Sequence, residues 1–380
     1  RAMANARKKC VLGILERSGH PHLGFEGATS ADASVYRTLL ERTGLYTERD
    51  GVWRYASPNE VHDPALARVW EITLALVSEP ASVPKALSEW VERLIAPPFG
   101  VRAGVLPVLL GAALRAGARC LAVRRNGQYI ADVLPSTVDE MCERHELYSI
   151  EVLDASEPTL AYLESIRAEF APGEDAVETD RVRAVYNAVS AWRRQLPEAA
   201  LATRSLGAEV APMQRVLRST EDPLDLIFRH FPELAGASLE GDGAAVVEGI
   251  SRLRKRLESV VEGYTQQAIE TARRCFGADT EEGVREAAAR WGGCLADAPV
   301  SDAVGRGLVR RAATALNQRH SDASFVRALS YMMLGLDFEH WSDGTAREFE
   351  ARLVGRLTRA VGRDDAVRII DEIRTEQAND

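Results

Sequence analysis

The spacing of apolar and polar positions divides the chain into a first part with helices and short strands and a second part with helices only. Apolar residues recur every three to four positions over residues 64–78, 84–95 and 101–116, which predicts three successive helices. The chain then alternates around Asn126-Gly127, a pair that favours a two-residue hairpin turn. Three helices followed by a β-hairpin, or wing, is the element order of a winged helix-turn-helix unit.

A shorter copy of that order lies upstream. Residues 30–42 have helical periodicity and end before Gly44, which favours helix termination. Residues 45–55 alternate and turn at Asp50-Gly51, where both positions tolerate a positive φ. The sequence therefore predicts a second hairpin that follows a helix.

Beyond position 156 every periodic segment has helical spacing. The predicted helices are 157–170, 175–195, 208–218, 223–230, 244–276, 280–291, 303–318, 323–334, 345–361 and 364–375. The longest of them carries apolar residues in steps of four and three, as in a heptad repeat: Val246, Ile250, Leu253, Leu257, Val260 and Tyr264. This stripe predicts the core of an intramolecular bundle, and a dimeric coiled coil is the alternative.

These patterns predict a mainly α fold in which winged-helix-like units with small β-hairpins precede a helical bundle. We expect a helical segment with a winged-helix-like hairpin at 1–60, a winged helix-turn-helix-like domain at 61–155 and the bundle at 156–380. The length of 380 residues exceeds one ordinary hydrophobic core, which favours several domains. Pro172-Gly173 is the predicted hinge at the start of the helical half.

Composition and charge restrict the possible partners. The formal net charge is -9, so any contact with nucleic acid would have to come from local basic patches. None of the five cysteines forms a C-x-x-C pair, which predicts reduced thiols and a cytoplasmic location. No apolar run approaches the roughly 18 residues of a membrane span, so we expect no membrane partner. The chain begins at Arg1 without Met, and a fragment of a longer protein is one expectation.

No complete catalytic motif is present. The G-x-x-x-x-G-K-[ST] pattern that binds nucleotide phosphates has no match in the sequence. His62-Asp63 could begin a metal-dependent hydrolase site, but the matching histidines and carboxylates are missing, and a helix N-cap at Asp63 is the preferred interpretation. His22, in a Gly/Pro-rich linker, and Cys142, one helical turn before a histidine, also lack partners. We therefore predict no catalytic residue, no metal site and no cofactor.

Arginines near the predicted hairpins are the candidate site residues. Arg124 and Arg125 come directly before the Asn126-Gly127 turn, so we expect their side chains at the wing tip, where guanidinium groups contact phosphates or a minor groove. The other candidates lie on or beside the helices that precede the two hairpins: Arg102, Arg115, Arg119, Arg37 and Arg42. The alternatives are a protein-contact module and ordinary solvated charges.

Four segments carry a resemblance to a known family. They are PPFGVRAGVLP at 97–107, ARKKCVLGILERSG at 6–19, YRTLL at 36–40 and DPL at 222–224. Together they resemble the region C-terminal to the ATPase domain of large bacterial P-loop ATPases of the phage-defence type, such as those of BREX and phosphorothioation-associated systems. The resemblance spans residues 4–236, and PPFG is its most specific part.

The resemblance implies a non-catalytic module that binds double-stranded DNA or docks other subunits of a defence complex. ATP hydrolysis is not carried over, because the family's Walker motifs have no counterpart here. Two further possibilities stay open. One is a homo-oligomer, and the other is a stand-alone winged-helix transcriptional regulator whose helical half senses a ligand or dimerises.

Overall fold

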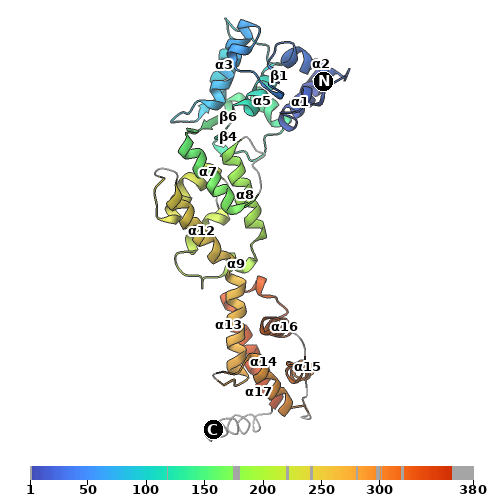
Figure 1. The fold of residues 1–380 in the computed structure, drawn as a ribbon, viewed down its shortest axis with the longest axis vertical. Coiled ribbons are helices and arrows are strands. Elements are labelled where there is room, and N and C mark those ends of the chain that lie inside the picture. The colour runs from blue at the N-terminus through green and yellow to red at the C-terminus, as the bar shows by residue number, and fades with distance from the viewer. Residues whose placement is uncertain are drawn as a thin grey trace. The chain divides into compact units, whose positions relative to one another are not determined.

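The structure is a computed structural model that describes residues 2–117, 119–173, 180–219, 222–239, 243–279, 281–296, 300, 302–317 and 321–361. The described chain is mainly helical with small antiparallel sheets, which confirms the predicted fold class (Figure 1). It forms two compact units, one made of residues 1–193 and 219–250 and the other of residues 194–218 and 251–380. The predicted division into three domains, with a hinge at Pro172-Gly173, stays a prediction.

The first unit begins with the predicted helix and hairpin. Its elements are α1 (Ala2–Glu16), η1 (Pro21–Gly24), α2 (Ala31–Tyr36), the π-helical η2 (Arg37–Glu41), β1 (Tyr46–Arg49), β2 (Val52–Tyr55) and η3 (Pro58–Glu60). The two strands pair antiparallel, with Arg49 opposite Val52. Asp50 and Gly51 have φ values of 54° and 79° at the turn, so the hairpin predicted from Asp-Gly is confirmed.

The second hairpin belongs to a larger sheet. The elements here are α3 (Pro64–Ser78), β3 (Lys85–Ala86), α4 (Leu87–Ile95), α5 (Leu106–Ala116), β4 (Leu121–Arg125), β5 (Gln128–Tyr129), α6 (Pro135–Glu143), η4 (His145–Leu147) and β6 (Tyr148–Val152). The strand order is β3-β6-β4-β5, and every neighbouring pair is antiparallel. The hairpin at Asn126-Gly127 is confirmed, and a winged-helix arrangement stays a prediction because β6 lies between β3 and β4.

The third predicted helix starts later than its apolar pattern suggests. Periodicity predicts a start at residue 101, but α5 begins at Leu106. Gly100 has a φ of 60°, and the Val101 N–H donates to Leu94 O (2.9 Å), so the chain first turns back along the end of α4. The residues from 101 to 105 are therefore loop rather than helix.

Helix α5 provides much of the core of the first unit. All eight residues from Leu106 to Ala113 are buried, and α5 packs against α1, α3 and α6. One cluster of buried side chains extends from Cys10 to Val152 and so joins the first hairpin to the larger sheet. Each fully buried aliphatic side chain contributes roughly 1.5–3 kcal/mol, so this cluster is the main source of stability here.

Helices complete the first unit. They are α7 (Glu157–Phe170), most of α8 (Arg181–Gln195), the π-helical η5 (Asp225–His230), α11 (Phe231–Ala235) and the first part of α12 (Ala244–Glu258). The Tyr162 hydroxyl donates to Ile227 O (2.8 Å), and the ring of Phe170 stacks on that of Phe231 at 6.0 Å. These contacts hold the segment after residue 222 against α7.

The described part of the second unit is helical throughout. It contains α9 (Glu198–Ala202), α10 (Ala211–Ser219), α13 (Val260–Cys275), α14 (Val284–Cys294), α15 (Ala303–Ala313), α16 (Asp322–Leu334), η6 (Phe338–His340) and α17 (Asp343–Val361). Asp343 accepts hydrogen bonds from the Thr203 hydroxyl (2.7 Å) and the Tyr264 hydroxyl (3.1 Å). One carboxylate thus connects α17 to α13 and to the end of α9. The predicted helix 364–375 lies outside the described residues.

The longest predicted helix is interrupted. Residues 244–276 form α12 and α13, and Ser259 between them has φ -80° and ψ 0°. The Ser259 hydroxyl donates to Arg256 O (3.0 Å), a local bond that competes with helix continuation. The six residues of the apolar stripe are all buried within the chain, as the intramolecular interpretation expects.

Candidate interaction site

Arg124 lies in the interior of the larger sheet rather than free at the hairpin tip. It pairs with Tyr129 of β5 on one side and Ser149 of β6 on the other, and its side chain is 14% exposed. The guanidinium forms ion pairs with Glu151 (2.7 Å) and with Asp222. Burial lowers the pKa of Arg124, but the hydrogen bonds to Asp222 and Glu151 outweigh it and raise that pKa. Two carboxylates therefore neutralise this charge.

Arg125 is more exposed but is also paired. Its Nη2 lies 2.7 Å from Glu140 Oε1, and its guanidinium lies 5.9 Å from the centre of the Tyr148 ring. A phosphate at this position would have to compete with the carboxylate of Glu140. The expected role of Arg124 and Arg125 in nucleic-acid binding stays a prediction. Both guanidinium groups at this hairpin are paired with carboxylates.

The other candidate arginines are spread over different surroundings. Arg37 donates to Ala28 O (2.9 Å), while the exposed side chains of Arg42, Arg102 and Arg119 have no partner among the described residues. Arg115 lines a cavity of about 230 Å³, and its Nε is buried without a hydrogen bond within the described chain. The structure brings Arg124 and Arg125 together but does not show the seven as one patch.

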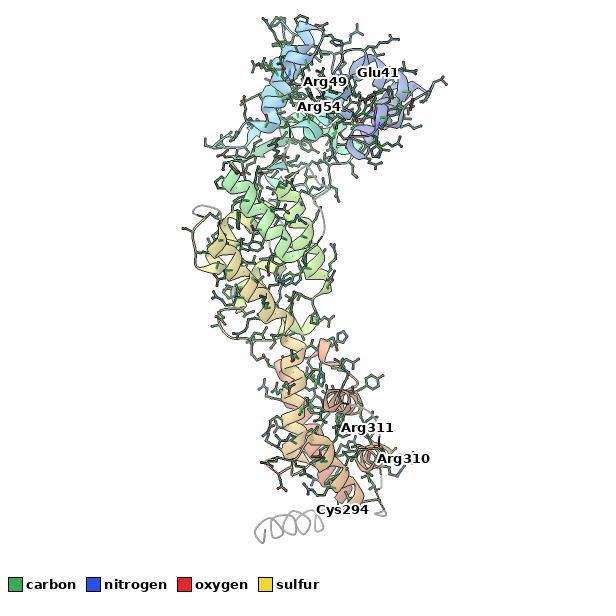
Figure 2. The ribbon with its side chains drawn as sticks, viewed as in Figure 1. Glu41, Arg49, Arg54, Cys294, Arg310 and Arg311 are labelled. Atoms are coloured by element: carbon green, nitrogen blue, oxygen red, sulfur yellow. The ribbon has the colours of Figure 1, made fainter. Side chains whose placement is uncertain are left out.

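The first hairpin shows the same pairing of arginine with carboxylate. Arg49 and Arg54 lie close together (Figure 2), and both bind Glu60, at 2.6 Å and 3.1 Å. Hydrogen bonds from Arg54 and Ser57 lower the pKa of Glu60 to about 2. Both arginines of this hairpin are thus paired with one carboxylate from η3, the segment that directly follows it.

The side chains considered as possible metal ligands are engaged in local hydrogen bonds or buried. Asp63 Oδ1 accepts hydrogen bonds from the amides of Ala65 (2.7 Å) and Leu66 (3.2 Å), so the predicted helix N-cap is confirmed. His22 Nδ1 lies 2.8 Å from Glu41 Oε1, and burial raises the pKa of the Cys142 thiol. Across the described residues, no group of three or more His, Cys, Asp or Glu side chains is arranged to hold a metal ion.

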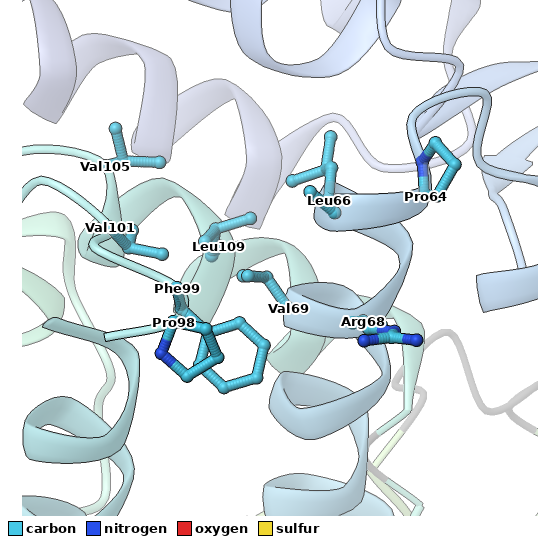
Figure 3. A pocket seen from close by; sticks show the side chains of 10 residues that line it. Pro64, Leu66, Arg68, Val69, Pro98, Phe99, Val101, Val105 and Leu109 are labelled. Carbon is cyan, nitrogen blue, oxygen red and sulfur yellow. The ribbon is translucent and has the colours of Figure 1, made fainter. Parts of the chain in front are cut away.

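An open apolar groove lies in the first unit, at the segment that contains PPFG (Figure 3). Its volume is about 460 Å³, within the roughly 300–1,000 Å³ that is usual for ligand sites. One wall is the start of α3, which contributes Leu66 and Val69. The opposite side is formed by Phe99 in the turn after α4, and Leu109 of α5 also lines the groove. The side chains of Val69, Phe99 and Leu109 lie near one another in the close view.

Local hydrogen bonds hold the PPFG wall in place. The Phe99 N–H donates to Ala96 O (3.1 Å), and so does the Gly100 N–H (3.2 Å). Gly100 adopts a positive φ, which residues with a side chain disfavour. A Cβ atom at this position would meet no atom within 4 Å, so glycine is needed here for its backbone conformation and not for lack of space. This turn presents Phe99 toward α3 with its ring only partly buried.

One charged side chain lines the groove, and one charge of each sign lies next to the lining in sequence: Asp63, which caps α3, precedes Pro64, and Arg102 follows Val101. Among the described residues that line the groove, Arg68 is the only charged one. Val101 also lines the groove, and the exposed Arg102 follows it in sequence. Neither Arg68 nor Arg102 has a side-chain partner among the described residues. From the sequence, PPFG is the most specific part of the resemblance and Arg102 is a candidate nucleic-acid contact. The groove was missed, because α3 and α5 are brought beside PPFG only by folding.

Comparison with known proteins provides no relative from which a function could be transferred. No protein-family model, no curated protein and no solved structure matches the chain. None of the helices in the described ranges combines the length and apolar character needed to cross a bilayer. The geometry of the first unit is therefore the basis on which we infer a function.

Proposed function

We propose that this protein is a non-catalytic docking module that binds a segment of a partner protein in the groove beside PPFG. The observation that carries the proposal is the groove itself, an open apolar surface of about 460 Å³ between α3, the PPFG turn and α5. When a partner covers apolar side chains that are partly exposed in a concave site, the burial stabilises the complex by roughly 25 cal/mol per Å² of apolar surface. Docking needs no reacting group, and the lining supplies none beyond Arg68.

A protein segment fits this surface better than nucleic acid does. Nucleic-acid affinity comes largely from cations that replace counterions along the phosphates, and the hairpin arginines are already paired with Glu151, Asp222 and Glu140. The formal net charge of -9 opposes the approach of a polyanion. Apolar grooves of this kind bind peptide side chains through burial rather than through long-range charge.

The resemblance to phage-defence ATPases gives the proposal a biological setting. In that setting the bound segment belongs to another subunit of a defence complex, and the module holds that subunit near an ATPase. The setting can be tested by reading the coding sequence on either side of residues 1–380. A Walker motif in the same reading frame would support it. The regulator alternative predicts a short reading frame without such a motif.

A random peptide library displayed on phage tests the docking proposal directly. Panning against the full chain should enrich peptides with apolar anchors, and these should lose at least tenfold in affinity for Ala65→Trp. Ala65 lines the groove and is exposed, so a tryptophan fills the site without emptying the core. Ala131→Trp, at another exposed position, is the matched control and should bind normally.

Two outcomes would overturn the proposal. One is a panning experiment that enriches no peptide over the uncoated surface. The other is enrichment of peptides whose affinity is the same for wild type, Ala65→Trp and Ala131→Trp. Far-UV circular dichroism of both variants checks that each keeps its helical content.

A further inference from the structure

We infer that the segment bound in the groove is acidic as well as apolar, with a carboxylate beside the anchoring side chain. This inference rests on the proposed docking function and specifies the chemistry of the partner. It comes from the groups around the groove that carry positive charge: two arginines and the amino-terminal ends of two helices.

Arg68 supplies the first charge. It lies on α3 next to Val69, lines the groove, and is exposed without a partner among the described residues. The nearest carboxylates along the helix are Asp63, which caps the first turn, and Glu71, which is exposed and forms no ion pair with Arg68. The guanidinium is therefore available to a carboxylate that enters with a partner, and its planar donors suit bidentate binding.

Arg102 supplies the second charge from the loop that follows PPFG. Its neighbour Val101 lines the groove, and the Arg102 carbonyl accepts the Val105 N–H (2.8 Å), which fixes this turn of the chain beside the site. The Arg102 side chain is exposed and has no partner in the described chain. Arg102 is one of the predicted nucleic-acid contacts, and its place one residue after the lining residue Val101 suits a peptide carboxylate instead.

The two helices add positive potential. Both α3 and α5 begin at the groove: Pro64 and Ala65 of the first turn of α3 line it, as does Val105 at the N-cap of α5. Helix N-termini carry about half a positive charge, which favours carboxylates within about one turn. Asp63 offsets this at α3, but α5 has no side-chain cap, so its amino end is not compensated in the same way.

Together these groups define a partner of one chemical class. An apolar side chain would enter between Val69, Phe99 and Leu109, and an Asp or Glu next to it would face Arg68 or Arg102. A basic peptide would meet two unpaired guanidinium groups, and desolvating like charges at close range opposes binding. A wholly apolar peptide would fill the groove but leave both arginines without a partner.

The test repeats the panning with Arg68→Glu/Arg102→Glu beside wild type, and uses Arg42→Glu as the control. Arg42 is likewise exposed and unpartnered among the described residues, but neither Arg42 nor a residue next to it in sequence lines the groove. Pools from wild type and Arg42→Glu should be enriched in Asp and Glu next to the apolar anchor, and the pool from the double variant should be enriched in Lys and Arg. Replacing the acidic residue of a selected peptide with its amide should weaken binding to wild type about two- to fivefold and leave the double variant unaffected.

Equal acidic content in all pools would overturn the inference. If Ala65→Trp still abolished binding in that case, the docking function would stand and only its charge preference would fall. If Ala65→Trp had no effect, the docking function itself would fall. Displacement of the selected peptide by a short DNA duplex from wild type, but not from the double variant, would identify nucleic acid as the occupant and also overturn the inference.

Discussion

The β4–β5 hairpin and the PPFG groove use arginine in opposite ways. In the hairpin, Arg124 binds Glu151 and Asp222, and Arg125 binds Glu140, so the guanidinium groups hold the fold together. At the groove, Arg68 lines the apolar surface and Arg102 follows the lining residue Val101, and neither arginine has a side-chain partner among the described residues. The difference teaches that an arginine beside a turn is not by itself a binding residue, because its availability depends on carboxylates supplied from elsewhere in the chain.

The largest expected effect is the loss of stability when Arg124 of the hairpin loses one of its two carboxylate partners. Asp222→Ala removes an ion pair with Arg124 and also the acceptor for the Leu224 N–H (2.9 Å). Arg124 keeps Glu151, but the loss of one charged hydrogen bond to a largely buried guanidinium together with the loss of a helix cap should lower the free energy of unfolding by about 2–4 kcal/mol. Urea denaturation followed by circular dichroism measures this change.

Asp225→Ala is the control for that substitution. Asp225 is 47% exposed and pairs at 3.5 Å with Arg229, which is 57% exposed, so its loss should cost less than about 1 kcal/mol. Equal effects of Asp222→Ala and Asp225→Ala would contradict the view that Arg124 is a structural residue.

An intermediate effect is expected in the pH dependence of the first hairpin. Arg54 and Ser57 lower the pKa of Glu60 from 4.5 to about 2, so the carboxylate favours the folded state above pH 4.5. That contribution is lost as the pH falls from 4.5 through about 2. Arg54→Met should return the pKa of Glu60 toward 4.5, and carbon-detected NMR of the Glu60 carboxyl group measures the shift. An unchanged pKa near 2 would show that Arg54 does not hold this carboxylate.

The smallest expected effect on stability is at the groove. Arg68→Met and Arg102→Met remove charges that stabilise nothing in the described chain, so the free energy of unfolding should change by less than about 0.5 kcal/mol. Thermal melts under identical conditions test this. A loss comparable to that of Asp222→Ala would mean that these arginines have structural partners and would remove the contrast between hairpin and groove.

Local chemistry made part of the fold predictable. Asp50-Gly51 and Asn126-Gly127 identify both hairpin turns because few other pairs accept positive φ at two successive positions. Asp63 before Pro64 identifies the start of α3 for a similar reason, since the carboxylate satisfies amides within its own first turn. In each case the deciding interaction spans only a few residues.

Contacts between distant residues account for what the sequence did not reveal. Asp222 is separated from Arg124 by almost a hundred residues, and nothing near Arg124 in the sequence indicates that it will be neutralised. The insertion of β6 between β3 and β4 depends on pairing such as Lys85 with Ile150. The groove likewise requires α3 and α5 to lie beside PPFG. Periodicity predicts the helices and strands, but it does not predict which of their charged side chains stay unpaired and so available to a binding partner.

Hydrogen–deuterium exchange with a panned peptide tests the central claim most directly. If the groove is the docking site, the peptide should slow exchange at residues 64–69 and 98–109 and leave residues 121–129 of the hairpin unchanged. Slowed exchange confined to residues 121–129, with the groove segments unaffected, would contradict it.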